Sequence, residues 1–233
     1  FNDVIQSLEP KVNTMFGYDE AARTYREFYS NLNADKSDNK YTDIFKGKNV
    51  IFIHAESIQN FLIDLEINGI EITPNLNKLA SEGLYFSRFY PQISVGTSSD
   101  TEFTLTTGLM PSSSGTVFLN YYDRTYEALP SLFNDSDYYT FSMHGNNADY
   151  WNRKTMYKSL GYQHFYAEDS YEFSNDETQD DYVGLGLSDK SFFKQSIEKL
   201  LEIKSNNEKY MGTIITLSNH SPFNDLDKYP DLD

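Results

Sequence analysis

From residue 47 onward, short apolar runs alternate with segments of helical spacing, and this alternation constrains the fold more than any other feature. The runs typical of strands are residues 49–54, 84–89, 138–143 and 210–217. The segments typical of helices are residues 73–83, 98–107, 152–160 and 188–203. Strands that alternate with helices form a mostly parallel sheet, because each crossover helix returns the chain to the same end of the sheet. We therefore predict an α/β fold with helices on both faces of the sheet.

Local signals sharpen some of these assignments. The first run, residues 49–54, is continuously apolar, which predicts a strand buried on both faces. Thr73 and Pro74 are typical of a helix start, with Thr as the N-cap and Pro at the first helical position, and Gly83 is typical of the helix end. The acidic and aromatic segment 168–181 favours a surface loop.

The polar residues 1–46 differ from the rest of the chain. A helical stripe near the start consists of Ala22, Tyr25, Phe28 and Tyr29. Residues 31–46 are mostly polar and indicate a linker. We therefore predict a helical lead-in and linker over 1–46 and a compact domain over 47–233.

Charge and composition exclude several classes of partner. The formal net charge is −16, so the surface repels nucleic acid and anionic lipid, and we expect no nucleic acid partner. Phosphate chemistry on such a chain needs a local cation or a local basic pocket. No cysteine is present, which is compatible with a bacterial protein outside the cytoplasm. No apolar run is long enough to cross a bilayer, so we expect any membrane anchor to lie outside this chain.

Polar residues follow the predicted strands, where α/β sheets gather functional side chains. The four candidate segments are residues 54–57, 96–100, 144–146 and 218–220. Within the first, Glu56 is a candidate ligand for a hard cation such as Mg²⁺ or Mn²⁺, because these ions favour oxygen donors. The alternative is a carboxylate that only favours a helix N-terminus.

The second segment places Thr97 and Ser98 at a predicted helix start. Free N–H groups and the helix dipole there stabilise a phosphoryl group on a neighbouring hydroxyl. No base adjoins these hydroxyls in the sequence, so a metal ion is the natural activator. The alternative is an ordinary Ser/Thr cap with acidic residues in the first turn.

The remaining candidates bind substrate or move protons. Arg153 offers a fork suited to phosphate, and Trp151 can pack on a glycerol or sugar. The alternatives are pairing with acids for Arg153 and core packing for Trp151. His220 is a candidate general acid or phosphate donor, or else a surface histidine. His164 has no strand-end position, and we interpret it as structural.

Five segments together resemble the lipoteichoic acid synthase family. They are residues 49–58 (NVIFIHAESI), 73–79 (TPNLNKL), 96–103 (GTSSDTEF), 144–153 and 216–223 (TLSNHSPF). The resemblance runs from about residue 47 to 224 and implies an alkaline-phosphatase-like α/β fold. It implies a Mn²⁺ or Mg²⁺ cofactor and transfer of glycerol phosphate from phosphatidylglycerol to a growing polymer or a glycolipid anchor. It also implies a covalent glycerophosphoryl intermediate and a location on the outer face of a Gram-positive membrane or in the cell wall.

The resemblance assigns roles to individual residues. Glu56 matches the glutamate that holds the metal. The family pattern is Gly-(basic)-Thr-Ser-Asp, so a gapless match makes Ser98 the nucleophile, and a shift by one residue makes Thr97 the nucleophile. Both stay candidates for nucleophile and metal ligand. The substrate-binding residues match His144, Trp151, Arg153 and His220.

Two departures leave the function open. The basic residue of the pattern is absent, and the family's downstream Asp-His pair does not occur before Asp233. We therefore expect the metal site to be completed outside this chain, and the chain alone to be weakly active or inactive. The alternatives are another phospho- or sulfo-ester enzyme of the sulfatase superfamily and a non-catalytic domain that binds a glycerol-phosphate polymer. A formylglycine sulfatase is disfavoured, because residues 97–100 lack the Pro and Arg of its motif.

Overall fold

A computed structural model describes residues 12, 15, 18–33, 37–174, 181–223 and 225–228. Parts of the predicted lead-in, linker and acidic loop, and position 224 at the end of the family resemblance, lie outside these residues. The chain divides into two compact units, residues 1–46 and 47–233. In the described part of the chain, no helix has the length and apolarity needed to cross a membrane.

The first unit contains the long helix α2 (Tyr18–Asn33), which includes the predicted helical stripe. Ala22 and Tyr29 on this stripe are half-buried, whereas Tyr25 and Phe28 are exposed. Turns follow over residues 40–47. The predicted helix is therefore present, and two of the four residues of its stripe are exposed.

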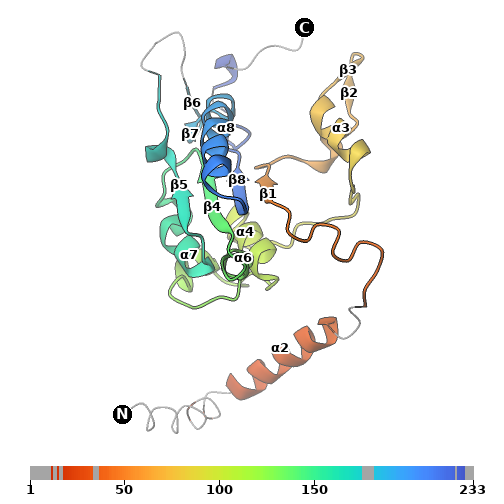
Figure 1. Ribbon diagram of the computed structural model, residues 1–233, viewed down its shortest axis with the longest axis vertical. Coiled ribbons are helices and arrows are strands. Elements are labelled where there is room, and N and C mark those ends of the chain that lie inside the picture. Colours follow the sequence, from red (N-terminus) through yellow and green to blue (C-terminus); the bar gives the residue numbers. More distant parts are fainter. Residues whose placement is uncertain are drawn as a thin grey trace. The chain divides into compact units, whose positions relative to one another are not determined.

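The second unit contains the sheet and the helices that cover it (Figure 1). Its strands are β1 (Val50–His54), β2 (Glu66–Ile67), β3 (Ile70–Glu71), β4 (Tyr139–His144), β5 (His164–Tyr166), β6 (Tyr182–Val183), β7 (Gly186–Leu187) and β8 (Tyr210–Ile215). Its α-helices are α3 (Pro74–Glu82), α4 (Ser98–Thr107), α5 (Val117–Asn120), α6 (Leu129–Asn134), α7 (Arg153–Leu160) and α8 (Asp189–Asn206). Short 3₁₀ helices are η1 (Asn60–Leu62), η2 (Tyr150–Asn152), η3 (Glu168–Ser170) and η4 (Leu226–Lys228).

Four of these strands form the main sheet in the order β1-β8-β4-β5, and every neighbouring pair is parallel. The last strand in the sequence, β8, lies between β1 and β4. The predicted parallel α/β sheet is confirmed. Two short antiparallel hairpins, β2–β3 and β6–β7, lie outside this sheet.

Helices cover both faces of the sheet, as predicted. Successive side chains of a strand point to opposite faces, and β8 contributes to two separate cores. Met211 and Ile215 pack with Phe103 of α4 and Met156 of α7. Ile214 faces the other way, into a core that α8 closes and whose members include Phe141, Met143, Phe192 and Ile203. Figure 1 shows α8 lying across this second face.

Two expectations about the strands are wrong. β1 is an edge strand with only β8 beside it in the described chain, and Ile51, Phe52 and Ile53 are exposed rather than buried. Residues 84–89 form no strand, because no described segment pairs with them, and most of their apolar side chains are exposed. An apolar run forms a buried strand only where tertiary neighbours exist on both sides.

Other elements were not predicted although some carry a local signal. The β2–β3 hairpin turns at Asn68 and Gly69, whose φ angles of 53° and 81° suit the two-residue turn that Asn-Gly favours. Short helices such as α5 and α6 carry too few residues to show a helical period. These elements fill the connections around the sheet without changing its order.

Candidate active site

The carboxyl ends of three strands meet at one level of the sheet. In the strand register, His54 of β1 and His144 of β4 both lie beside Ile215 of β8. The segments that follow these strands therefore leave the same edge of the sheet. This edge is where the strand-end rule places functional residues.

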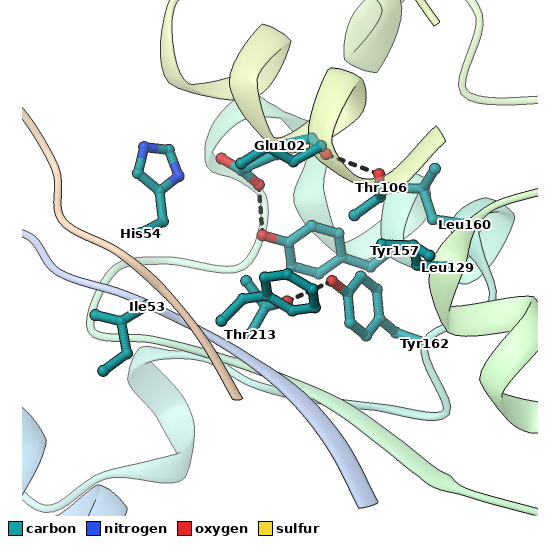
Figure 2. Close-up of a pocket in the computed structure, with 11 residues that line it drawn as sticks. Ile53, His54, Glu102, Thr106, Leu129, Tyr157, Leu160, Tyr162 and Thr213 are labelled. Atoms are coloured by element: carbon teal, nitrogen blue, oxygen red, sulfur yellow. Dashed lines mark hydrogen bonds between the residues drawn. The ribbon is translucent and has the colours of Figure 1, made fainter. Parts of the chain in front are cut away.

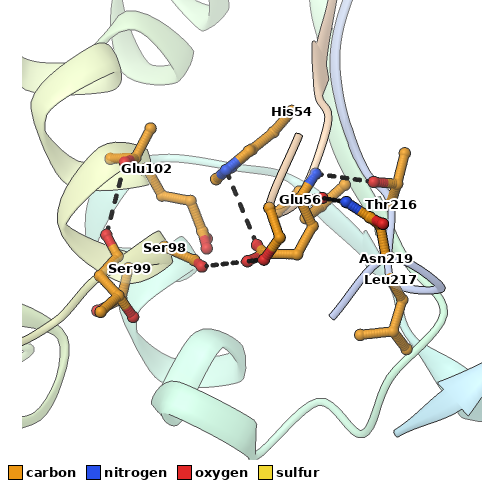
Figure 3. Close-up of polar contacts among 12 residues, drawn as sticks. His54, Glu56, Ser98, Ser99, Glu102, Thr216, Leu217 and Asn219 are labelled. Carbon is orange, nitrogen blue, oxygen red and sulfur yellow. Dashed lines mark hydrogen bonds and ion pairs between the residues drawn. The ribbon is translucent and has the colours of Figure 1, made fainter. Parts of the chain in front are cut away.

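Glu56 and Ser98 meet at this edge, although 42 residues separate them. The Ser98 hydroxyl, at the start of α4, donates to Glu56 Oε1 at 2.9 Å. The Ser57 hydroxyl donates to the same oxygen at 3.1 Å, and the Glu56 backbone N–H donates to the Thr216 hydroxyl at 2.8 Å. Figure 3 shows Ser98, His54 and Glu102 directed toward the space around the Glu56 carboxylate.

The Glu56 carboxylate is buried, and no Lys or Arg of the described chain forms an ion pair with it. Glu56 is 7% exposed, and His54 Nε2 lies 3.9 Å from Glu56 Oε2. A carboxylate removed from water is costly unless a cation or several donors compensate it. A carboxylate and a hydroxyl are oxygen donors that suit Mg²⁺ or Mn²⁺. Glu56 and Ser98 supply two such donors next to each other. Among the described residues, no group of three or more His, Cys, Asp or Glu able to hold a metal occurs.

Thr97 is placed differently from Ser98. Its side chain is exposed, and it makes no capping hydrogen bond to α4. Its φ of 45° and ψ of −110° are strained for a β-branched residue. Ser57, directly after Glu56, also has a positive φ of 56°. Strain therefore adjoins both partners of the Glu56–Ser98 contact, and the contact itself favours Ser98 over Thr97 as the functional hydroxyl.

Asp100 explains why a glycine precedes the hydroxyl run. The buried Asp100 Oδ2 accepts hydrogen bonds from the backbone N–H of Ser94 at 2.8 Å and of Gly96 at 2.9 Å. These bonds fold the loop that leads into α4. A Cβ on Gly96 would lie 2.3 Å from Asp100 Oδ1 and 2.7 Å from the Thr116 hydroxyl oxygen. Only glycine fits this close approach, so Gly96 and Asp100 together position Ser98.

We expect Gly96→Ala to destabilise the protein by about 1–3 kcal/mol, because the methyl group forces the Asp100 carboxylate away from its two N–H donors. Urea unfolding monitored by circular dichroism measures this loss. Gly83→Ala is the matched control, since its only close neighbour is the Leu79 carbonyl oxygen at 3.2 Å. Equal losses for the two variants would contradict the role assigned to Gly96.

His144 is a neutral histidine with a defined tautomer. Its Nδ1 lies 3.1 Å from the Ile215 carbonyl oxygen, and a carbonyl only accepts, so Nδ1 carries the proton. Burial and the nearby Arg153 charge lower the pKa of His144 to about 3. Its Nε2 is therefore an acceptor at neutral pH.

The other predicted substrate residues have different surroundings. Arg153 is buried and paired with Glu102. Trp151 is half-buried and packs against the core on the α7 side of the sheet, with a φ of 56°. His220 is half-buried in the turn after β8, where its Nδ1 contacts the Ser221 carbonyl. In the described part of the chain, no hydrogen bond or ion pair joins Trp151 or His220 to Glu56 or Ser98.

Asp189, which the sequence reasoning missed, holds the turn that carries His220. Its carboxylate accepts from the backbone N–H of Leu217 at 2.7 Å and of Ser218 at 3.1 Å. In return, the Ser218 hydroxyl accepts from the Asp189 backbone N–H at 2.7 Å. The start of α8 is thereby joined to the end of β8.

This carboxyl predicts a pH effect on stability. Burial raises the pKa of Asp189, although the two backbone N–H donors oppose the rise. A carboxyl with a raised pKa holds its proton more tightly in the folded state, so its contribution to the free energy of unfolding falls as pH rises. We expect the free energy of unfolding of wild type, minus that of Asp189→Asn, to decrease from about pH 3 to about pH 6. Chemical unfolding across this range measures it, with the exposed Asp149→Asn as control, and a flat difference for Asp189→Asn would oppose the prediction.

Glu102 and Tyr157 were also missed, although helical spacing carries a signal for both. Glu102 follows Ser98 by four residues on α4, and Tyr157 follows Arg153 by four on α7. Residues four apart share a helix face. The two faces meet beside a cavity of about 70 Å³ that Glu102, Tyr157 and His54 help to line (Figure 2).

Comparison with known proteins agrees with this fold. The sulfatase family matches residues 48–233, so the chain belongs to the sulfatase family. The chain is 38% identical over 202 residues to lipoteichoic acid synthase 1 of Bacillus subtilis, an alignment that covers 85% of this chain and 30% of that protein. The resemblance to the lipoteichoic acid synthase family is thereby confirmed.

Solved structures support the same assignment. The lipoteichoic acid synthase LtaP of Listeria monocytogenes matches with a TM-score of 0.77 and 32% identity, covering 85% of this chain and 48% of that one. A protein of the alkaline phosphatase superfamily from Vibrio parahaemolyticus matches with a TM-score of 0.64 and 25% identity, covering 78% of this chain and 42% of that one. The predicted alkaline-phosphatase-like fold is confirmed. The chain spans about a third of the length of the curated relatives it matches.

Proposed function

We propose that this chain is part of a metal-dependent transferase that moves glycerol phosphate from phosphatidylglycerol to a lipoteichoic acid chain or its glycolipid anchor. The observation that carries the proposal is the 2.9 Å contact between the Ser98 hydroxyl and the Glu56 carboxylate at the start of α4. The names of the relatives, lipoteichoic acid synthases, support the choice of reaction. By the same likeness, we place this activity on the outer face of the membrane.

In the proposed reaction, Ser98 is the nucleophile. A bound Mn²⁺ or Mg²⁺ would be held by Glu56 and Ser98, and it would lower the pKa of the hydroxyl and neutralise phosphate charge. The Ser98 oxygen forms a bond to phosphorus, and the bond from phosphorus to the diacylglycerol oxygen breaks. Ser98 loses its proton, the diacylglycerol oxygen gains one, and diacylglycerol leaves. The product on the chain is a glycerophosphoryl-serine, which an acceptor hydroxyl then attacks.

The remaining residues bind and orient the substrate in this proposal. The Nε2 of neutral His144 accepts a hydrogen bond from a glycerol hydroxyl. The Arg153 guanidinium donates to phosphate oxygens. Trp151 packs on the glycerol, and His220 protonates the leaving oxygen. The positive end of the α4 helix dipole, at its start, stabilises the negative charge on the phosphate oxygens.

A lipid-choice assay on the full-length enzyme tests the proposal. Vesicles that contain fluorescent phosphatidylglycerol or phosphatidylethanolamine are incubated with the enzyme and Mn²⁺. We expect diacylglycerol release from phosphatidylglycerol alone, together with a glycerol phosphate adduct that mass spectrometry locates on Ser98. Release from phosphatidylethanolamine instead would point to a different enzyme of the superfamily. No release, with retained binding of a glycerol-phosphate polymer, would point to a binding domain.

A further inference from the structure

A buried ion pair joins α4 to α7 next to the Glu56–Ser98 contact. Arg153 Nη2 lies 2.7 Å from Glu102 Oε1, and Arg153 Nε lies 3.1 and 3.2 Å from the two Glu102 oxygens. Both side chains are 3% exposed. Burial alone would raise the pKa of Glu102, but the Arg153 charge and the hydrogen bonds from Arg153 and Tyr157 hold it below its usual range. Glu102 is therefore ionised at neutral pH.

Tyr157 completes the contacts of this carboxylate. Tyr157 lies one helical turn beyond Arg153 in α7, and its hydroxyl donates to Glu102 Oε2. Figure 2 shows this hydrogen bond. Burial and the Glu102 charge raise the pKa of Tyr157 well above its usual value, so its hydroxyl stays a donor. The carboxylate thus accepts from three N–H or O–H groups of α7, which leaves the Arg153 guanidinium one orientation.

The free edge of the guanidinium has no partner. Glu102 occupies Nε and Nη2, whereas Nη1 is buried without a hydrogen bond to any described residue. Buried donors without partners are rare in folded proteins. The Glu56 charge helps to raise the pKa of Arg153, and the Arg153 charge helps to lower the pKa of His144. Arg153 therefore lies within electrostatic reach of the site, and among the described residues both N–H groups of its Nη1 are without a partner.

We infer that Glu102 and Tyr157 are positioning residues, which fix the Arg153 guanidinium so that its free Nη1 edge meets a phosphate oxygen of the substrate. This inference rests on the proposed function, in which Arg153 binds phosphate. Because Glu102 already balances the positive charge, recognition depends on the fixed orientation of the donors more than on net attraction. A pair that serves only to join α4 and α7 would leave phosphate binding unchanged when Tyr157 loses its hydroxyl.

The test measures phosphate affinity, Mn²⁺ affinity and unfolding in the full-length enzyme. Tyr157→Phe removes one hydrogen bond and keeps the ring, and Glu102→Gln keeps the shape and removes the charge. We expect each to weaken binding of inorganic phosphate at least about tenfold by calorimetry, with Mn²⁺ affinity within about twofold of wild type. Tyr162→Phe is the matched control, since its hydroxyl contacts Thr213 instead and phosphate affinity stays unchanged.

The outcomes separate this inference from the proposed function. Loss of phosphate affinity in Arg153→Gln, with wild-type affinity in both Tyr157→Phe and Glu102→Gln, would overturn the positioning role and leave Arg153 as a phosphate ligand. Unchanged affinity in Arg153→Gln would overturn the inference together with the role of Arg153. Weakened phosphate binding in the Tyr157 and Glu102 variants supports the inference even if phosphatidylglycerol is not turned over, in which case only the proposed reaction fails.

Discussion

Ser98→Ala is expected to lower glycerol phosphate transfer by the full-length enzyme at least about a thousandfold, because no oxygen remains at the position that faces Glu56. The side chain makes one hydrogen bond and is half-buried, so we expect the variant to fold with a loss of about 1 kcal/mol. Diacylglycerol release from phosphatidylglycerol vesicles measures the rate, and circular dichroism checks the fold.

Two companion variants decide which hydroxyl acts. Ser98→Thr keeps an oxygen at the same position, and we expect it to retain activity within about tenfold of wild type. Thr97→Ala removes an exposed side chain with no capping bond, so its effect should be small by comparison. If Thr97→Ala instead abolishes transfer and Ser98→Ala retains it, the assignment of Ser98 is wrong. The family motif then aligns one residue earlier, with Thr97 as the nucleophile.

The second large effect is expected for Glu56→Gln. The amide can still accept a hydrogen bond from the Ser98 hydroxyl, but it carries no charge, so the site loses the buried carboxylate that contacts this hydroxyl. We expect Mn²⁺ affinity of the full-length enzyme to fall at least about a hundredfold, since a hard cation binds charged oxygen far better than amide oxygen. Calorimetric titration with Mn²⁺ measures this without any substrate.

A surface carboxylate provides the control for this change. Glu82 at the end of α3 is exposed and lies 4.0 Å from Lys78 in an i,i+4 pair, so Glu82→Gln should bind Mn²⁺ as wild type does. Equal Mn²⁺ affinity in Glu56→Gln and wild type would remove Glu56 from the metal site. Transfer activity, measured in parallel, should fall with the metal affinity.

The sequence predicted the sheet because its parallel order follows from the chain order. The meeting of Glu56 with a hydroxyl was expected from the family resemblance, which left both Thr97 and Ser98 open as the partner. Alternating elements dictate parallel strands, and parallel strands bring their carboxyl ends to one edge, as His54, His144 and Ile215 do. Burial could not be predicted in the same way. The apolar run of β1 is exposed because burial depends on which elements flank a strand, and composition does not encode this.

The partner of Arg153 could not be predicted from the sequence, for a related reason. The sequence allowed two roles, pairing with acids or binding phosphate. In the structure the guanidinium pairs with Glu102, while its Nη1 has no partner among the described residues. Which acid it meets depends on how α4 and α7 pack against each other and on the rotamers of both side chains. Spacing within each helix carried a signal for the shared faces that the sequence reasoning did not use, and the partner face comes only from the tertiary structure.

The edge position of β1 has a practical consequence for work with this chain in isolation. One side of the strand presents backbone N–H and C=O groups that no described segment occupies, next to the exposed Ile51, Phe52 and Ile53. Such an edge is a template for strand addition. A second molecule that pairs with the β1 edge would also bury these exposed apolar side chains. The isolated 233-residue chain should therefore oligomerise or precipitate as its concentration rises.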